Sequence, residues 1–290
     1  MVRRTLVVGP GRAGRSLALA EARAGHHVQL LGRGPGPWME WARLQGIEPL
    51  LGPPETAGLG KARVVLFAVP DGALASAAAE VARALPPRRK RFAAHLSGFH
   101  GLEPLRPFEC LGHATAALHP ILSFGDPDRD LLTLLRARVT VLAPEEAQKD
   151  ALRVVRSWGA RPLLLPPDVD RRRYHLALSL ASNHLLALLY EAEELLRPAL
   201  GEEARDTVVE LARQSLEAAG REGPGPALTG PVVRGDAEVV AGHLQALEGA
   251  AAARYRALAL SLVDLAVASG RLQGEARRRM AEVLAERRRP

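Results

Sequence analysis

Two polar side chains, His119 and Ser97, follow short apolar runs that are expected to be strands. Residues at the carboxyl ends of strands often contact ligands, so these two are candidates for acid–base chemistry. His119 precedes Pro120, and a histidine with a pKa near neutrality is suited to donate a proton to a carbonyl oxygen or an imine nitrogen. Ser97 precedes Gly98 and is positioned to contact a substrate or a ribose hydroxyl. The alternative interpretations are that His119 bonds a loop carbonyl and that Ser97 only forms a turn with Gly98.

A second set of polar residues follows a helical spacing within an apolar stretch. His175, Ser179, Ser182 and Asn183 stand at i, i+4, i+7 and i+8, which on an α-helix places them within a stripe about 100° wide. Several donors on one face suit the orientation of a substrate, and we expect this of Asn183 and His175. The alternatives are that His175 is a satisfied core histidine and that the serines bond back to helix carbonyls.

Arg234 lies in a turn-rich segment, residues 229–236, and is the expected clamp for a substrate carboxylate. Asp236 is interpreted as the N-cap of the following helix rather than as an acid. The spacing of cysteine and histidine predicts no metal site. Cys110, the single cysteine, is expected to be a small buried or half-buried side chain.

A glycine-rich loop follows the apolar run of residues 6–8 and opens into a helical pattern. It reads Gly9-Pro10-Gly11-Arg12-Ala13-Gly14, which is the G-x-G-x-x-G pattern of a strand-to-helix turn. Such a turn lets the backbone approach a pyrophosphate and directs free N–H groups and the helix dipole at it. We therefore predict a dinucleotide-binding loop, with Gly9, Gly11, Arg12, Ala13 and Gly14 as cofactor contacts.

Arg33 stands at the end of the second predicted strand, where an NAD-binding protein usually carries an acidic residue. A carboxylate repels a 2′-phosphate, whereas a guanidinium binds it. The sequence therefore predicts NADP(H) as the cofactor. The alternative is that Arg33 is an ordinary surface arginine in an arginine-rich protein.

Short apolar strands alternate with helices through the first half of the chain, which predicts an α/β Rossmann domain with a doubly wound parallel sheet. Strands are expected near residues 28–31, 62–69, 92–96, 115–118, 139–142 and 161–165. Ligands bind outside the carboxyl ends of such strands, so Val69 and Pro70, at the end of the strand over 62–69, are also predicted cofactor contacts. We assign residues 1–166 to this domain.

Residues 167–290 read as an all-α domain for substrate binding and dimerisation. A long helix over 170–199 is apolar on nearly every side, which predicts burial as a central post or at a subunit interface. Further helices are expected over residues 202–219, 235–247, 251–269 and 275–288. A homodimer is the expected assembly.

Composition limits the class of partner. The net charge of +7 suits small anionic molecules, but aromatic residues make up only 4% of the chain, too few for a nucleic-acid stacking platform. No apolar run is long enough to cross a membrane, and the N-terminus carries no signal-peptide core. We expect a cytoplasmic protein with no nucleic-acid or membrane partner. Arginine far exceeds lysine, which suggests a GC-rich and thermophilic source.

These motifs together resemble a bacterial family with an NADP-binding Rossmann-like domain followed by a helical domain of unknown function. The family is akin to ketopantoate reductases, pyrroline-5-carboxylate reductases and other proteins with a C-terminal domain like that of 6-phosphogluconate dehydrogenase. The resemblance covers nearly the whole chain. It rests on residues 9–14, 69–71, 95–98, 118–124, 174–183 and 227–236.

The resemblance also bears on single residues. Ketopantoate reductases carry a lysine and two asparagines at i, i+4 and i+8 of the interdomain helix, where this chain has His175, Ser179 and Asn183. Without the lysine, His175 or His119 must supply the proton. The His119-Pro120 pair is also similar to the pair that carries the catalytic histidine of prephenate dehydrogenases.

The resemblance implies an NADPH-dependent oxidoreductase acting on a C=O or C=N group of a small anionic carboxylate, most simply the reduction of a 2-oxo acid such as ketopantoate. Two alternatives stay open. One is a pyrroline-5-carboxylate or prephenate-type dehydrogenase. The other is an NADP(H)-binding regulatory protein without turnover.

Overall fold

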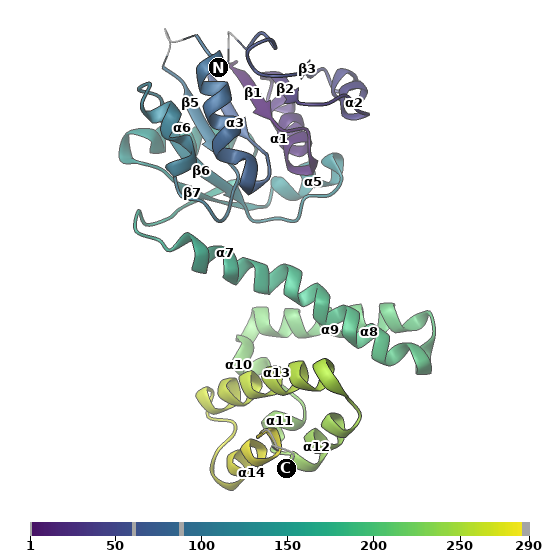
Figure 1. The fold of residues 1–290 in the computed structure, drawn as a ribbon. Coiled ribbons are helices and arrows are strands. Elements are labelled where there is room, and N and C mark those ends of the chain that lie inside the picture. Colours follow the sequence, from purple (N-terminus) through teal and green to yellow (C-terminus); the bar gives the residue numbers. More distant parts are fainter. Residues whose placement is uncertain (1, 60–61, 87–89, 286–290) are drawn as a thin grey trace. The chain divides into compact units, whose positions relative to one another are not determined.

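The computed structural model describes residues 2–59, 62–86 and 90–285 (Figure 1). The chain divides into two compact units, Met1–Ser182 and Asn183–Pro290. The boundary after residue 166 stays a prediction; the division into compact units keeps the next helix, α7 (Arg171–Ser179), with the first unit.

The first unit alternates strands and helices along the chain. In order, its elements are β1 (Arg4–Val8), α1 (Arg12–Arg23), β2 (His27–Gly32), α2 (Trp38–Leu44), β3 (Glu48–Leu51), β4 (Val64–Phe67), α3 (Asp71–Ala84), β5 (Phe92–His95), the 3₁₀ turn η1 (Glu103–Leu105), α4 (Arg106–Glu109), β6 (Ala114–Pro120), α5 (Pro127–Leu134), β7 (Arg138–Leu142), α6 (Glu145–Ser157), β8 (Arg161–Leu164) and α7.

The strands form one sheet in the order β3-β2-β1-β4-β5-β6-β7-β8. The first six strands follow the strand order of a Rossmann fold and are parallel, as predicted. The expectation of a wholly parallel sheet is wrong at one place, because β7 pairs antiparallel with β6. An antiparallel strand starts at the end of the sheet where the preceding strand stops, so no crossover is needed. The segment that contains α5 therefore returns the chain directly beside β6.

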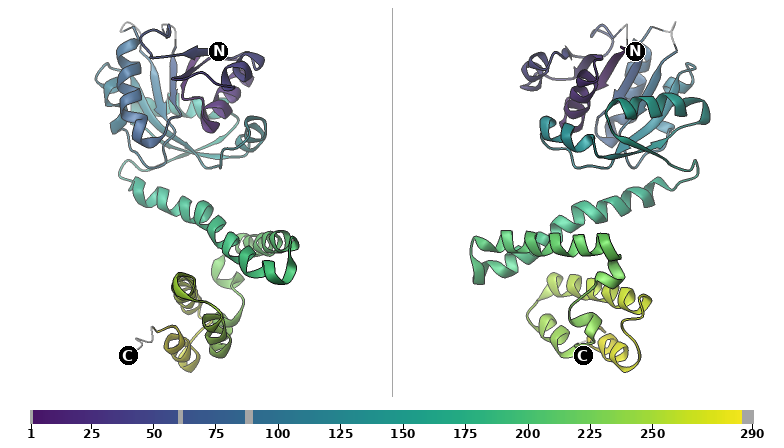
Figure 2. Two further views of the ribbon diagram at one scale, coloured as in Figure 1. Left: turned by 45° about the vertical axis from the view of Figure 1, so that its right-hand side comes forward. Right: turned by 180° about the vertical axis from the view of Figure 1, so that it is seen from behind.

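Helices cover both faces of the sheet (Figure 2), which explains why its central strands are almost continuously apolar. Successive residues of β1 point to opposite faces. Val7 packs in a core with α1, α2, α5 and α6, whereas Leu6 and Val8 pack in a second core with α3, η1 and α4. The strand order reverses between β1 and β4, which fixes the position of the site described below.

A buried carboxylate joins three segments at the end of the sheet where β1 begins, opposite to the glycine loop. Glu21, at the end of α1, is fully buried and accepts hydrogen bonds from Arg3 Nη2 at 2.5 Å, Thr5 Oγ1 at 2.6 Å and Trp158 Nε1 at 2.7 Å. The charge is therefore paired and its oxygens are satisfied, as burial of a carboxylate requires. The network fastens α1 to β1 and to the end of α6.

The second unit is helical (Figure 1). Its elements are α8 (Leu185–Leu200), α9 (Glu203–Glu222), α10 (Pro224–Ala227), α11 (Pro231–Arg234), α12 (Ala237–Gln245), α13 (Gly249–Ala268) and α14 (Gly274–Leu284). Val232, Val240, Val263 and Met280 belong to a small core formed by α11 to α14. Two short helices, α10 and α11, precede α12, and α11 lies in the segment over residues 229–236 that the sequence marks as rich in turns. The last predicted helix extends to residue 288, and residues 286–290 lie outside the described part.

The long predicted helix over 170–199 is helical but not regular. A π-helical turn, η2 (Leu180–His184), separates α7 from α8. The angular spacing of an uninterrupted α-helix therefore does not apply between His175 and Asn183. Burial of this helix within the chain is also wrong, because α8 contains no buried residue.

Three further findings concern Cys110, membrane-spanning helices and metal-binding groups. Cys110 is exposed, not buried, since it follows the short surface helix α4. Within the described residues, no helix is long and apolar enough to cross a membrane. The same part of the chain contains no group of three or more His, Cys, Asp or Glu side chains that could hold a metal ion.

We expect Glu21→Ala to lower the free energy of unfolding by about 3 kcal/mol or more, because it leaves the Arg3 guanidinium without its carboxylate. The measurement is urea denaturation. Glu40→Ala, on the exposed face of α2, is the matched control and should change stability by less than about 0.5 kcal/mol. Equal effects of the two substitutions would contradict the role of the network.

Candidate functional site

The glycine loop joins β1 to α1 through two close backbone contacts. Gly9 has a φ of +105°, and a Cβ built there would lie 2.5 Å from the carbonyl oxygen of Ala68. A Cβ on Gly14 would collide with the carbonyl oxygen of Gly9. These two glycines therefore allow the tight turn and the close packing of α1 on the sheet.

Gly11 differs from the other two glycines of the loop. Its φ of −67° suits any residue, and a Cβ built there meets nothing within 4 Å. The space beside it belongs to a cavity of about 270 Å³. A glycine at this position leaves the backbone open to a ligand, which is the property that a pyrophosphate site needs.

The cavity lies at the carboxyl ends of β1, β2 and β4, where the strand order reverses. Its lining includes Gly9, Gly11, Arg33, Val69 and Pro70, five of the predicted cofactor residues. Arg12, Ala13 and Gly14 form the first turn of α1 beside it. That turn has no side-chain cap and no acidic residue, so its free N–H groups and dipole remain available to an anion. The chemistry of this cavity fits a dinucleotide.

Arg33 is paired across the cavity with a residue that the sequence did not single out. Its Nη2 lies 3.3 Å from both carboxylate oxygens of Glu80, which is on α3 and also lines the cavity. Arg33 is 68% exposed, whereas the Glu80 side chain is 30% exposed. Arg33 is therefore the member of the pair that is more accessible to solvent and to a ligand.

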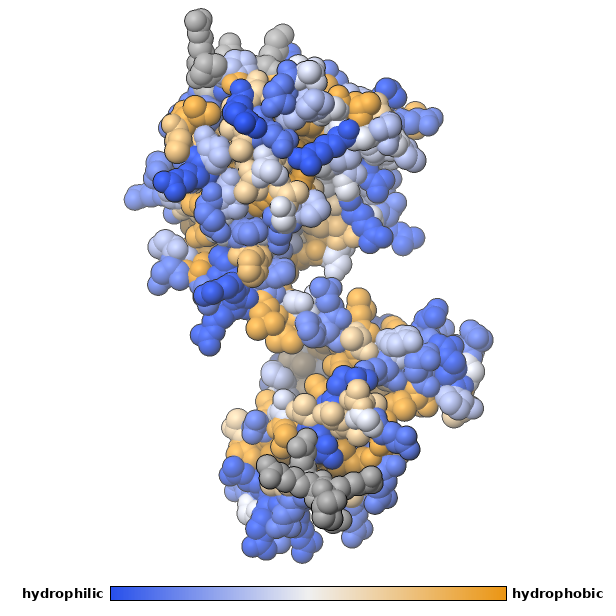
Figure 3. Space-filling model, viewed as in Figure 1, coloured by the Kyte–Doolittle hydropathy of each residue, from blue (hydrophilic) through white to orange (hydrophobic). Residues whose placement is uncertain are grey.

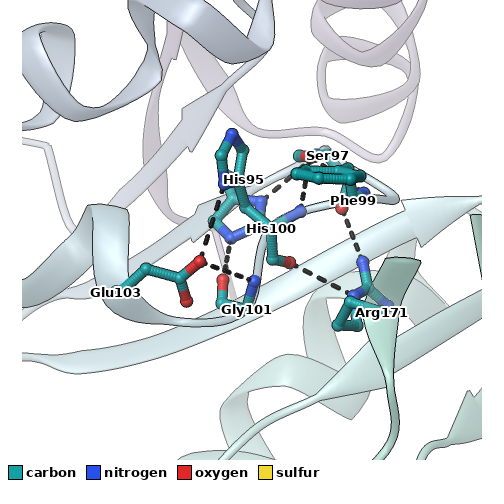
Figure 4. Close-up of polar contacts among 7 residues, drawn as sticks. All are labelled: His95, Ser97, Phe99, His100, Gly101, Glu103 and Arg171. Carbon is teal, nitrogen blue, oxygen red and sulfur yellow. Dashed lines mark hydrogen bonds and ion pairs between the residues drawn. The ribbon is translucent and has the colours of Figure 1, made fainter. Parts of the chain in front are cut away.

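A second polar cluster surrounds the loop after β5 (Figure 4). His95 is fully buried at the end of the strand; its Nε2 lies 2.6 Å from the carbonyl oxygen of Gly101, and its Nδ1 accepts from the Ser97 N–H. His95 is therefore neutral with its proton on Nε2. Ser97 Oγ accepts from the N–H groups of Phe99 and His100. The hydroxyl thus forms the turn, and among the described residues no hydrogen bond uses its own proton.

Arg171 holds this loop from α7. Its Nη2 donates to the carbonyl oxygen of Ser97 at 2.6 Å and its Nε to that of His100 at 3.1 Å (Figure 4). The residue is 7% exposed, and its guanidinium stacks over the Tyr174 ring at 4.8 Å. Sequence reasoning missed it, because a run of three arginines at a helix start is typical of a solvated surface.

His119 is part of a hydrogen-bonded chain that fixes its tautomer. Its Nδ1 lies 2.8 Å from the Tyr174 hydroxyl, which lies 2.8 Å from Thr140 Oγ1, and Thr140 in turn donates to the carbonyl oxygen of His119. Each hydroxyl has one proton, so all three bonds form together only if His119 donates from Nδ1 to Tyr174 and Tyr174 donates to Thr140. The lone pair of the ring is then on Nε2.

Gly98 lies against the two predicted catalytic histidines. A Cβ at this position would lie 2.9 Å from Nε2 of His119 and 2.7 Å from Cδ2 of His175. The two rings are 6.3 Å apart. The structure therefore brings together three of the sequence-predicted residues, Ser97, His119 and His175, and a glycine is required at their meeting point.

Burial and a neighbouring positive charge set the protonation of the cluster. Desolvation, with the charges of Arg171 and His175, lowers the pKa of His119 to about 4. Burial likewise lowers the pKa of His95 to about 4. The expectation of a near-neutral pKa for His119 is therefore wrong. At neutral pH the ring is therefore uncharged, and its Nε2 carries a lone pair and no proton.

Two predicted residues belong to the second unit. Asn183 lies in the π-helical turn, and Arg234 ends α11 and donates from Nε to Asp236 at 2.8 Å. Asp236 occupies the N-cap position of α12, as expected, but its carboxylate bonds Arg234 instead of the helix N–H groups. Ser182 Oγ donates to the carbonyl oxygen of Leu178. This agrees with the alternative interpretation, in which the serines bond back to helix carbonyls.

Comparison with known proteins supports a two-part chain. A model of a Rossmann-like domain matches residues 3–120, and a model of a domain of unknown function, DUF2520, matches residues 137–262. The chain therefore carries a Rossmann-like domain followed by a DUF2520 domain, in agreement with the resemblance predicted from its motifs. No curated protein matches the sequence.

Several solved structures share the fold along nearly the whole chain. A protein from Bacteroides fragilis assigned as an NADP oxidoreductase is 20% identical with a TM-score of 0.75, covering 90% of this chain and 97% of its own. A protein from Thermotoga maritima is 21% identical with a TM-score of 0.69, covering 92% and 99%. A Plasmodium falciparum pyrroline carboxylate reductase with NADP bound is 11% identical with a TM-score of 0.55, covering 96% and 98%.

The lowered pKa values make stability depend on pH. A histidine whose pKa falls from 6.5 to about 4 on folding binds its proton more readily in the unfolded chain between these pH values. Stability is therefore complete above pH 6.5 and falls with decreasing pH, by about 1.4 kcal/mol per pH unit for each histidine, until about pH 4.

His119→Asn should remove the His119 contribution, about half of this dependence, whereas His27→Asn, at the exposed start of β2, should leave it unchanged. The measurements are denaturation at several pH values and the NMR titration of the ring nitrogens. A His119 midpoint above pH 6 would refute the assignment.

Proposed function

We propose that this protein is an NADP(H)-dependent oxidoreductase that acts on a C=O or C=N group of a small carboxylate, as a reductase of a 2-oxo acid similar to ketopantoate reductase. The observation that carries the proposal is the open backbone at Gly11, between two glycines that packing requires, beside a cavity that contains Arg33. A loop of this construction fits a pyrophosphate, and an arginine at the end of β2 fits a 2′-phosphate.

Different residues of the cavity would bind different parts of the cofactor. The first turn of α1, with Arg12, Ala13 and Gly14, would bind the pyrophosphate, and Arg33 the 2′-phosphate. Val69 and Pro70 would lie along the rest of the cofactor toward the end of β4. When bound, a nicotinamide supplies or accepts the hydride. The protein named above with NADP bound has the same fold, which agrees with this proposal.

The cluster at the ends of β5 and β6 would then handle the proton and the substrate. Ser97 retains a hydroxyl proton that can donate to a carbonyl oxygen, and Arg171 holds its loop in place. His119 would exchange a proton at Nε2, with Tyr174 and Thr140 fixing the ring. His175 and Asn183 remain candidate substrate contacts, and Arg234 a candidate carboxylate clamp after exchange of Asp236 for the substrate.

The uncharged state of His119 favours a second candidate function, a dehydrogenase that oxidises its substrate. A neutral imidazole with its lone pair on Nε2 is ready to accept the proton of a substrate hydroxyl as hydride leaves. A prephenate-type dehydrogenase needs this step. In the reductive direction, including that of a pyrroline-5-carboxylate reductase, the same nitrogen must first be protonated. A regulatory protein without turnover needs neither step.

We also propose that the protein is a homodimer. A mostly apolar groove of about 340 Å³ on the helical unit is lined by Leu188, Tyr190, Leu195 and Leu258, and apolar side chains are visible on the surface of this unit in Figure 3. Large apolar side chains of α8 and α9, among them Leu186, Leu195, Leu211 and Leu216, are more than half exposed in the single chain, and a second copy would cover them. The cytoplasmic location and the thermophilic source stay predictions.

The dimer should be seen by size-exclusion chromatography with light scattering. Leu195, which is 64% exposed in the single chain, lines the groove, and Leu195→Arg should give a monomer because it buries a charge in the interface. Leu132→Arg, at an equally exposed leucine of α5, is the control and should leave the mass unchanged. A monomeric wild type would overturn the proposal.

The function is tested by following NADPH oxidation against a panel of 2-oxo acids and cyclic imines, with NADH in parallel. We expect a substrate in the panel, and a preference for NADPH that Arg33→Ala reduces about tenfold through weaker binding. His119→Asn should retain NADPH binding and lower kcat about 100-fold.

Arg43→Ala, an exposed arginine of α2 outside the cavity, is the control for loss of a positive charge. Equal use of NADPH and NADH by the wild type would contradict the role of Arg33. Binding of NADPH without turnover of any substrate, in either direction, would favour the regulatory alternative.

A further inference from the structure

An ion pair lies in the cavity beside the glycine loop. Arg33 and Glu80 both line it, and the two charges contact each other there. The remaining lining is largely apolar, with Ala73, Ala77 and Val81 on the same helix as Glu80. Glu80 therefore has a polar neighbour in Arg33 on an otherwise apolar wall.

The geometry of the pair shows that it is weak. In the hydrogen bonds that the structure describes, Arg33 uses one nitrogen, Nη2, for both oxygens of Glu80 at 3.3 Å. A strong arginine pair instead uses two nitrogens in parallel. Arg33 is also 68% exposed, and exposed ion pairs contribute little to stability. The arginine can thus exchange partners at small cost.

We propose that Glu80 is a specificity-determining residue that competes with the 2′-phosphate for Arg33 and so limits the preference for NADP(H) over NAD(H). The inference rests on the proposed function, because it assumes a dinucleotide in the cavity. With a 2′-phosphate bound, Arg33 leaves Glu80, and the carboxylate remains near a second anion. With a 2′-hydroxyl, Arg33 keeps Glu80, and nothing is exchanged.

The position of Glu80 on α3 explains why it was not found by motif reasoning. An acidic residue that affects cofactor choice is expected at the end of β2, where this chain has Arg33. Glu80 is 47 residues further along. Glu80 nevertheless lies beside Arg33. Arg33 follows β2, which pairs with one side of β1, and Glu80 is on α3, which follows β4 on the other side of β1.

The test uses two fragments of the cofactor, 2′,5′-ADP and 5′-AMP, titrated by calorimetry at fixed ionic strength. The wild type should prefer 2′,5′-ADP. Glu80→Gln removes the charge but keeps the shape, and should tighten 2′,5′-ADP about two- to fivefold, the range that corresponds to an exposed ion pair, with little change for 5′-AMP. Glu40→Gln, on α2 outside the cavity, makes the same change in net charge and should affect neither fragment.

The double variant decides whether Glu80 acts through Arg33. In an Arg33→Ala background, Glu80→Gln should tighten 2′,5′-ADP less than in the wild type, because only the repulsion between the carboxylate and the phosphate is left to remove. An equal gain in that background would overturn the competition. A wild type that prefers 2′,5′-ADP but does not respond to Glu80→Gln would overturn this inference and leave the proposed function standing. A wild type that binds neither fragment would overturn both.

Discussion

The first unit depends on one backbone contact, between the carbonyl oxygen of Gly9 and the Cα of Gly14. A Cβ on Gly14 would collide with that oxygen, and a Cβ on Gly9 would lie 2.5 Å from the Ala68 carbonyl of the neighbouring strand. The contact lets α1 start directly at the end of β1, in the middle of the sheet. It thereby places the helix N-terminus at the reversal of strand order, and the cavity forms where β1, β2 and β4 end together.

The second constraint is the buried positive charge of Arg171. By bonding two carbonyl oxygens, Arg171 fixes the loop that carries Ser97 and Gly98. Its charge also acts on His119, where burial already disfavours protonation. The same side chain thus fixes the loop and adds to the effect of burial, which is the main reason that the pKa of His119 is low. The charge state of the cluster at neutral pH thus depends in part on how the side chain at the start of α7 packs.

Sequence patterns predicted much of the fold because its signals are local. The glycine loop, the buried strands and the helical second half were each found from runs of a few residues, but β3 was not, because it is a short and partly exposed edge strand that contains a proline. The reversed direction of β7, the π-helical turn at Leu180–His184 and the exposure of α8 were not found. Each depends on neighbours in space or on backbone geometry that side-chain periodicity does not record.

The sequence by itself determined the residue types that can hold a dinucleotide and the places where a proton could move, because glycine spacing and a histidine before proline are visible in the chain. The tertiary structure alone decided what those residues meet. It paired Arg33 with Glu80, joined His119 to Tyr174 and Thr140, and put an unforeseen arginine behind Ser97. Partners and pKa values depend on distance and burial, and these are fixed only when separate segments pack together.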